Sequence, residues 1–559
     1  MKWSQTLIPT LHEALADAGI LSHKLLPLLL LSSVLVVKAD QYGDFGYTTN
    51  GSTVTITNYI GSGGTVTIPD WITNLPVTSI GESAFASSGL TSVTIGTNVT
   101  GIGESAFANC SSLTNVTMGN GVTSIGLNAF YYCTSLTNIT MGTNIASIAN
   151  NVFWHCSSLP SITIPSSVTN IGEEAFGYCS SLTNVTISTN ITSIEGYVFQ
   201  YCSSLTSVTI STNITSIGDD AFYDCTSLTD VTIPNSVTNL GKFVFAQCSS
   251  LTNVTISTNI TSIEDGVFEW CNSLASVTIG TNVTSIGKGA FSASGLTSVT
   301  IPNSVTSLGD NAFTGCASLT DVTIGTNVTS LGDFAFGSCA SLPSVTIPNS
   351  VTSIGEGAFQ NCTSLTNVTI PNSVTNIGAQ AFWHCTSLTS ITIPSGVTNI
   401  GNYAFDSCSS LTSVTIGNGV TNIGDAAFLD CTSLIGVYFH GNPPSLGSGV
   451  FTDDTNATVY YLSGTTNWPT VPDTWAGRPT ALWKPQVQTS DSSFGVRTNR
   501  FGFTIAWASG MVVVVEACTN LFTPTWSPVG TNTLTGGSSY FSDSAWTNYH
   551  GRFYRLRSP

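Results

Sequence analysis

The stretch AFGYCSSLTNVTI runs from Ala175 to Ile187. The chain reads VFQYCSSLTSVTI at residues 198–210 and AFYDCTSLTDVTI at residues 221–233, so the pattern returns every 23 residues. A fixed period of this length predicts a solenoid, because one turn cannot bury its apolar face alone and stacked turns share one continuous core.

The cysteines mark this period along most of the chain: Cys110, Cys133, Cys156, Cys179, Cys202, Cys225, Cys248, Cys271, Cys316, Cys339, Cys362, Cys385, Cys408 and Cys431. Ser87 holds the same position in the first turn, and Ala293 holds it in a turn that is one residue short. These fourteen cysteines and two replacements predict sixteen turns.

Each turn divides into three segments. In LTNVTI (Leu182 to Ile187), Val185 and Ile187 alternate with polar residues, which predicts a strand with these two side chains in the core. A corner and a second extended piece, such as VTNI at 168–171, complete the path. The segment GEEAFGYC at 172–179 is interpreted as a short helix or 3₁₀ turn that returns Phe176 and Cys179 to the core.

We interpret the cysteines as a buried ladder of small hydrophobic side chains with weak S–H donors. Stacked turns would bring neighbouring Cα atoms to about 5 Å, a distance that does not exclude disulfides. The odd number of cysteines, 15, and their parallel side chains favour free thiols, whereas export to an oxidising compartment favours the disulfide alternative.

The unit LTNVTIPNSVTNIGAQAFWHCTS (Leu365 to Ser387) resembles the repeat of the BspA-type leucine-rich repeat family of bacterial surface and secreted proteins. The resemblance extends from about Thr65 to Phe439. It implies an exported solenoid that binds other macromolecules and is associated with adhesion to host matrix proteins and cells. The family offers no catalytic residues to carry over and no particular ligand.

The expected fold is therefore an α/β solenoid: a leucine-rich repeat of about sixteen 23-residue turns, with a parallel sheet on one face and short helical turns on the other. We expect a signal peptide at 1–39, an N-terminal β cap at 40–66, the solenoid at 67–440, a C-terminal cap at 441–484 and a β-sandwich-like module at 485–559. The last module is interpreted as a secretion or attachment domain, or alternatively as a cap or spacer.

The N-terminus carries features of an export signal. The apolar run LLPLLLLSSVLVV (Leu25 to Val37) precedes the small-residue cleavage pattern VKA at 37–39. An uncleaved anchor is the alternative, because the leader is long and contains Glu13 and Asp17. No other run is long enough to cross a membrane, so we expect a secreted or cell-surface protein without a span in the mature chain.

Charge restricts the partners. Only 8% of the residues are charged and the net charge is −18. Between Asp40 and His440 the only Lys or Arg residues are Lys242 and Lys288. Phosphate backbones are bound by clustered Lys and Arg. Nucleic acid is therefore a poor candidate partner, and so is an anionic membrane surface.

The two positions between the repeated Phe and Cys vary while their neighbours do not. Over five consecutive turns they supply a predicted aromatic strip for ligand binding: Tyr131, Tyr132, Trp154, His155, Tyr178, Tyr201 and Tyr223. Exposed aromatic rows bind sugars or protein anchors. The alternative is that these rings pack on the next turn. Trp270 and the pair Trp383 and His384 occur later in the chain.

Other patterns indicate no chemistry. Acids follow Ile-Gly in many turns and could line a Ca²⁺ site, but they are interpreted as charge at helix N-termini: Glu82, Glu104, Glu173, Glu174, Asp219, Asp220, Asp310, Asp333, Glu356 and Asp425. The regular outward Thr column is attributed to strand preference, with water ordering as a weak alternative. No nucleophile–base motif, metal motif or phosphate loop occurs, so we expect no enzyme and no cofactor.

The expected function is an exported, non-catalytic binding or adhesion protein whose repeat surface takes an extracellular protein or glycan ligand. Two alternatives remain open: a structural envelope or matrix component without a discrete ligand, and a polysaccharide-binding module. The sequence does not indicate the oligomeric state.

Overall fold

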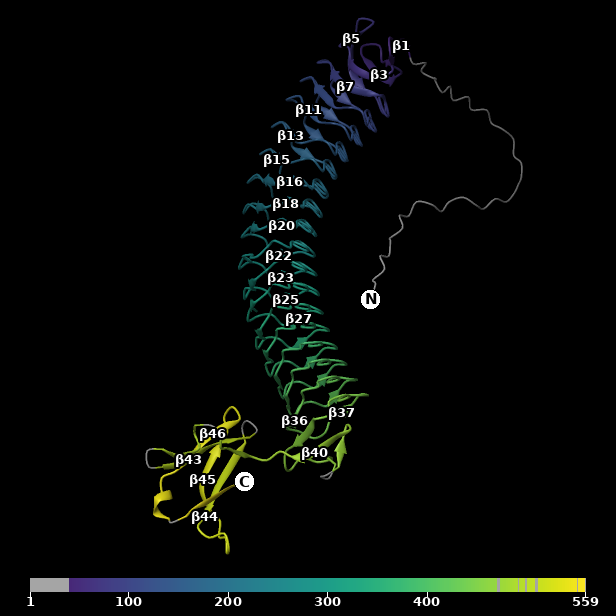
Figure 1. The fold of residues 1–559 in the computed structure, drawn as a ribbon. Helices are drawn as coiled ribbons and strands as arrows, with labels where there is room; N and C mark the ends of the chain where they lie inside the picture. Colours follow the sequence, from purple (N-terminus) through teal and green to yellow (C-terminus); the bar gives the residue numbers. More distant parts are fainter. Residues whose placement is uncertain are drawn as a thin grey trace, which may run out of the picture. The chain divides into compact units, whose positions relative to one another are not determined.

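The computed structural model describes residues 40–469, 473–490, 492–497, 500–507, 511–549 and 551–557. The predicted signal peptide at 1–39 lies outside these residues. The chain winds through about 19 turns of roughly 23 residues, and Figure 1 shows the strands of successive turns stacked on one another. This exceeds the sixteen turns predicted, because further turns follow Cys431.

The strands form two rows. The first row contains the predicted L-T-x-V-T-I strands and, after Cys431, three strands of other sequence (β36, β38 and β40). Its members are β4 (Gly64–Thr67), β7 (Leu90–Ile95), β9 (Asn115–Met118), β11 (Asn138–Thr140), β13 (Ser161–Thr163), β15 (Asn184–Thr186), β17 (Ser207–Thr209), β19 (Asp230–Thr232), β21 (Asn253–Thr255), β24 (Ser298–Thr300), β26 (Asp321–Thr323), β28 (Ser344–Thr346), β30 (Asn367–Thr369), β32 (Ser390–Ile393), β34 (Ser413–Ile416), β36 (Gly436–Phe439), β38 (Thr458–Tyr461) and β40 (Arg478–Leu482).

The second row contains the shorter extended pieces: β3 (Val54–Tyr59), β6 (Leu75–Ile80), β8 (Gly101–Ile102), β10 (Ser124–Ile125), β12 (Ser147–Ile148), β14 (Asn170–Ile171), β16 (Ser193–Ile194), β18 (Ser216–Ile217), β20 (Asn239–Leu240), β22 (Ser262–Ile263), β23 (Ser285–Ile286), β25 (Ser307–Leu308), β27 (Ser330–Leu331), β29 (Ser353–Ile354), β31 (Asn376–Ile377), β33 (Asn399–Ile400), β35 (Asn422–Ile423) and β37 (Ser445–Leu446).

Neighbouring turns pair in parallel with equivalent residues opposite one another. Val185 of β15 lies opposite Val208 of β17, and Ile194 of β16 lies opposite Ile217 of β18. Within β15 the flanking polar residues are exposed while Val185 is buried, as its alternating pattern predicts. The parallel solenoid and its inward residues are therefore confirmed.

The third side of each turn is not helical, so the prediction of a short helix or 3₁₀ turn was wrong. In the segment 172–179, Glu174 and Tyr178 have φ of 57° and 59°, which interrupts a helical path every fourth residue. Alternate N–H groups leave the segment: Ala175 bonds Gly172 O at 3.3 Å, whereas Phe176 bonds Val198 O of the next turn at 3.0 Å. Two consecutive tight turns result, and the one helix of the described chain is η1 (Trp546–Asn548).

The core contains a continuous ladder of phenylalanine rings. From Phe85 to Phe451 each ring stacks on the next, with centroids 4.9 to 5.8 Å apart. Offset ring stacks add stabilisation beyond the burial of apolar area. This ladder fixes the register of the turns.

The cysteines form a second buried ladder. All are free thiols; for example, Cys179 Sγ donates to Phe153 O at 3.2 Å and Cys156 Sγ donates to Phe130 O at 3.3 Å. Burial raises the pKa of the Cys179 thiol to about 12. The interpretation as small buried donors is confirmed. Asp454 occupies the same position 23 residues after Cys431 and is fully buried.

The ends depart from the repeat. At the N-terminus β1 (Asp40–Tyr42) and β2 (Phe45–Thr49) continue antiparallel from β3, and β5 (Trp71–Ile72) pairs with β6. Near the C-terminal end of the solenoid, β39 (Thr474–Trp475) pairs antiparallel with β40.

The remaining residues form an all-β module with two antiparallel sheets. One sheet contains β41 (Gln486–Gln488), β42 (Gly495–Arg497), β43 (Arg500–Ala506) and β46 (Ser538–Asp543); the other contains β44 (Val512–Cys518), β45 (Ser527–Thr533) and β47 (Phe553–Arg557). Phe503, Val515 and Phe541 belong to their common buried core.

Candidate ligand-binding surface

The paired tight turns create a distinct face of the solenoid, which we call the turn face. Each turn contributes three positions to it: the residue two positions before the ladder Phe, and the first and second residues after it. The first and third of these commonly have positive φ, as in Tyr197 (60°) and Tyr201 (56°) around Phe199. Such residues lie at the apex of a tight turn, so the three positions form columns along the face.

The structure brings all seven predicted strip residues into one array. Tyr131 stacks on Trp154 at 4.8 Å, and Tyr132 stacks on His155 at 4.3 Å. His155 then stacks on Tyr178 at 5.8 Å, and Tyr178 on Tyr201 at 4.3 Å. Tyr201 meets the edge of Tyr223 at 5.4 Å. The rings cover much of one another's faces.

The strip nevertheless contains polar atoms that packing does not satisfy. Trp154 Nε1, His155 Nδ1 and Asn151 Oδ1 are buried without a hydrogen-bond partner among the described residues. Leaving such groups unpaired costs about 1–3 kcal/mol each. Burial, reinforced by Tyr201, raises the pKa of the Tyr178 hydroxyl to about 12, so this group is a neutral donor at ordinary pH.

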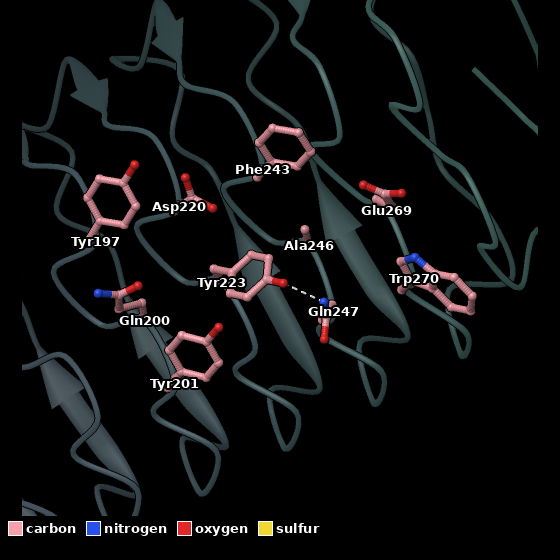
Figure 2. Close-up of a pocket in the computed structure, with 10 residues that line it drawn as sticks. All are labelled: Tyr197, Gln200, Tyr201, Asp220, Tyr223, Phe243, Ala246, Gln247, Glu269 and Trp270. Carbon is pink, nitrogen blue, oxygen red and sulfur yellow. Dashed lines mark hydrogen bonds between the residues drawn. The ribbon is translucent and has the colours of Figure 1, made fainter. Parts of the chain in front are cut away.

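The array continues into a groove of about 520 Å³ that sequence reasoning missed as a site (Figure 2). Its lining residues are Tyr197, Gln200, Tyr201, Asp220, Tyr223, Phe243, Ala246, Gln247, Glu269 and Trp270. We call this the turn-face groove. It shares Tyr201 and Tyr223 with the strip, and its volume lies in the range of small-ligand sites.

Small residues make the hollow. Gly266 has φ of 62°, and a Cβ atom there would lie 2.1 Å from the Phe243 ring, so this ring lies against a position that only glycine leaves open. Ala246 occupies the column where other turns carry Tyr223 or Trp154. Gln247 Nε2 donates to the Tyr223 hydroxyl, as the dashed line in Figure 2 shows. The groove thus lies where Ala246 replaces a larger side chain, between aromatic and polar side chains of the neighbouring turns.

The rings of the groove differ from those of the strip. Tyr197, Phe243 and Trp270 stack on no other aromatic ring in the described chain, unlike the strip rings. The Trp270 side chain is 52% exposed. A second hollow of about 250 Å³ lies beside the groove and shares Gln247 and Trp270 with it. Trp270 therefore stands between two hollows with its ring open to a ligand.

Two carboxyl groups line the groove without a cation. Burial, reinforced by the neighbouring Asp219, raises the pKa of Asp220 to about 6. Burial also raises the pKa of Glu269. No Lys or Arg lines the groove, and the nearby Lys242 bonds Asp265 at 2.8 Å.

The first column gives only part of a sequence signal for the groove. Four turns carry an aromatic residue two positions before the ladder Phe (Tyr197, Phe243, Phe334 and Tyr403), and of these Tyr197 and Phe243 line the groove. The recess itself left no such signal, because it depends on Gly266 and Ala246 in neighbouring turns.

The other sequence candidates lie elsewhere. Acids such as Asp219 and Asp310 accept the backbone N–H of the equivalent residue one turn later, at 2.8 and 2.9 Å. These hydrogen bonds therefore link neighbouring turns. The interpretation of the acids as charge at helix N-termini is wrong, because these segments form no helix. In the part of the chain that the structure describes, no three His, Cys, Asp or Glu side chains converge on a metal position. Trp383 donates to Asp406 at 3.1 Å and stands apart from the strip with His384.

Comparison with known proteins shows the family. The sequence matches the BspA type leucine rich repeat region over residues 78–206, 192–320, 284–378 and 329–458, which together make more than half of the chain. The chain therefore belongs to the BspA-type leucine-rich repeat family. Proteins of this family are generally non-catalytic binding scaffolds.

The chain is also similar to solved structures. The chain is 27% identical to a leucine-rich repeat protein from Bacteroides ovatus, with a TM-score of 0.52, over 76% of this chain and 99% of that one. It is 29% identical to a leucine rich cell surface protein from Faecalibacterium prausnitzii, with a TM-score of 0.40, over 68% of this chain and 94% of that one. No curated protein matches the chain. Over the described residues no helix has the length and apolar character needed to cross a bilayer.

Proposed function

We propose that this chain is an exported, non-catalytic adhesion protein that binds an extracellular protein or cell-surface ligand through its turn face. The observation that carries this proposal is the row of contacting rings from Tyr131 to Tyr223, which leads into a groove that Phe243 and Trp270 also line. Aromatic anchors of this kind dominate the energy of binding interfaces.

Export is part of the same proposal. The apolar run at 25–37 and the cleavage pattern at 37–39 support a signal peptide at 1–39. One similar structure is described as a cell surface protein. We propose that the module predicted at 485–559 serves secretion or attachment; deleting it and finding the same amounts of protein on cells and in the medium would contradict this role.

Polysaccharide binding is a second candidate function, favoured by the open ring of Trp270, since flat exposed rings also stack on sugars. The structural alternative, an envelope or matrix component, predicts no specific ligand. One binding screen separates the three.

The screen uses residues 40–559 on arrays of extracellular-matrix proteins and glycans. The strip variant carries Trp154→Ala, Tyr178→Ala and Tyr201→Ala. The matched control carries Trp383→Ala and His384→Ala, which removes aromatic rings from the same two columns several turns away. Circular dichroism spectra confirm that both variants remain folded.

We expect a wild-type hit that the strip variant loses and the control keeps. A protein hit supports adhesion, and a glycan hit supports the second candidate. Equal binding by the wild type, the strip variant and the control would show that the strip on the turn face does not bind the ligand. If none of the three binds anything, the result favours the structural role.

A further inference from the structure

The turn-face groove combines exposed aromatic rings with carboxyl groups that Tyr197 and Trp270 hydrogen-bond but that no cation neutralises. Asp220 and Glu269 line it, and Asp224 lines the adjoining hollow. The adjacent Lys242 is committed to Asp265. The groove is thus an anionic site on a chain of net charge −18, and its own residues supply no cation.

The rings favour the same kind of ligand. The face of an aromatic ring carries negative potential and attracts ammonium or guanidinium groups within about 6 Å of its centroid. Tyr197 and Trp270 stack on no other ring of the described chain and are 38% and 52% exposed, so their rings are open to a ligand, whereas the Phe243 ring lines the groove with Gly266 packed against it. In Figure 2 Asp220 and Glu269 lie on either side of Phe243, Asp220 towards Tyr197 and Glu269 next to Trp270.

Charge decides between the possible ligands. A sugar hydroxyl can bond a carboxylate, but it removes water from the anion without neutralising it, which adds to the cost of burial. An anionic ligand would meet repulsion from both carboxylates. A cationic side chain offsets the charge and lets its aliphatic stem pack on the rings.

We propose that the turn-face groove binds a lysine or arginine side chain of a protein partner. The cation faces Asp220 and Glu269, and the stem packs against Phe243 and Trp270. The adjoining hollow beyond Trp270 receives a neighbouring residue of the same segment. This inference rests on the proposed adhesive function and specifies its partner as a protein with an exposed basic segment, which the field of the acidic chain also attracts.

The test uses a labelled heptapeptide of alternating glycine and arginine. A second peptide replaces each arginine with citrulline, which keeps the shape and removes the charge. Cellohexaose is the neutral-sugar probe. Affinities are measured by fluorescence anisotropy, with the unlabelled sugar as competitor, at low and at physiological salt.

Two groove variants and one matched control separate specific binding from general attraction. The charge variant is Asp220→Asn with Glu269→Gln. The control is Asp310→Asn with Glu356→Gln, which removes the same charge from exposed positions on other turns. The ring variant Trp270→Ala leaves the net charge unchanged, and the exposure of this side chain favours an intact fold.

We expect the arginine peptide to bind at least tenfold more tightly than the citrulline peptide. The charge variant loses about tenfold in affinity and the control less than threefold. The ring variant loses about threefold to tenfold. Equal losses in the charge variant and the control, equal binding of the two peptides, or competition by cellohexaose would overturn the proposal.

The two proposals fail separately. If the array screen yields a ligand that depends on the strip while the arginine peptide ignores the groove variants, adhesion stands and the cationic site falls. If the peptide binds as expected, the cationic site stands whichever array ligand is found.

Discussion

Asp454 occupies the cysteine position of the turn that follows Cys431, and its side chain is fully buried. Both carboxyl oxygens lack a hydrogen-bond partner among the described residues. Burial raises the pKa of this carboxyl from its ordinary 3.8 to about 7, although the nearby backbone of Cys431 and the guanidinium of Arg478 act in the opposite direction. We predict that Asp454→Asn stabilises the C-terminal turns at high pH and has little effect at low pH.

The magnitude follows from the shift. A difference of about three pKa units corresponds to about 4 kcal/mol at about 1.4 kcal/mol per unit. The folded pKa is raised, so the folded state holds the proton more tightly than the unfolded state. Wild-type stability therefore falls as pH rises from about 4 to about 7, and the variant lacks this loss.

The assay is hydrogen exchange of the turns around Phe428 and Phe451, with urea unfolding as a second measure, at pH 4 and pH 8.5. Local exchange is preferred because repeat arrays lose turns from their ends without unfolding as one unit. The control is Asp453→Asn, which changes the exposed neighbouring carboxyl. A gain in stability that is the same at both pH values, or that the control reproduces, would refute the reasoning.

Three further predictions concern the core and the groove. Phe222→Ala removes a fully buried ring that stacks on Phe199 and Phe245 at 5.4 Å each; we expect a cost of about 3–5 kcal/mol in urea unfolding, and a cost below 1 kcal/mol would contradict the ladder. Gly266→Ala pushes on the Phe243 ring and should weaken arginine-peptide binding, whereas Gly289→Ala, with φ of 61° and no ring in contact, carries the same backbone strain of about 1 kcal/mol without this effect. Similar peptide affinities in these two variants would show that the ring position does not matter. The 15 buried thiols should react with a disulfide reagent only after denaturation, because the thiolate is the reactive form and burial raises the pKa of ladder thiols such as Cys179; rapid labelling of the native protein would count against a closed core.

The sequence predicted the stacking because the period, the Val-Thr-Ile alternation and the recurring Phe are direct consequences of a shared core. For the third side of the turn, the sequence led to the wrong prediction of a short helix. A segment such as GEEAFGYC has helix-compatible residues, and the positive φ at Glu174 and Tyr178 is invisible without glycine at those positions. The tertiary bond from Phe176 N to Val198 O replaced the local helical bond.

Only part of the candidate site could be predicted from the sequence. Tyr201 and Tyr223 could be placed in one row because they share a column. The recess next to them depends on the absence of side chains at Gly266 and Ala246, and on the direction in which Phe243 lies. Such a hollow arises from several turns together, so no single repeat carries its signature.

The ladder of phenylalanine rings also affects how the number of turns can change during evolution. Each ring meets an almost identical ring above and below, and the three apex residues of a turn take no part in that contact. Recombination between the segments that encode two turns would therefore add or remove whole turns without a mismatch of ladder rings at the junction. Each such event would move, copy or erase a set of apex side chains, so the reach and chemistry of the exposed face can change in a single genetic step while the interior stays the same.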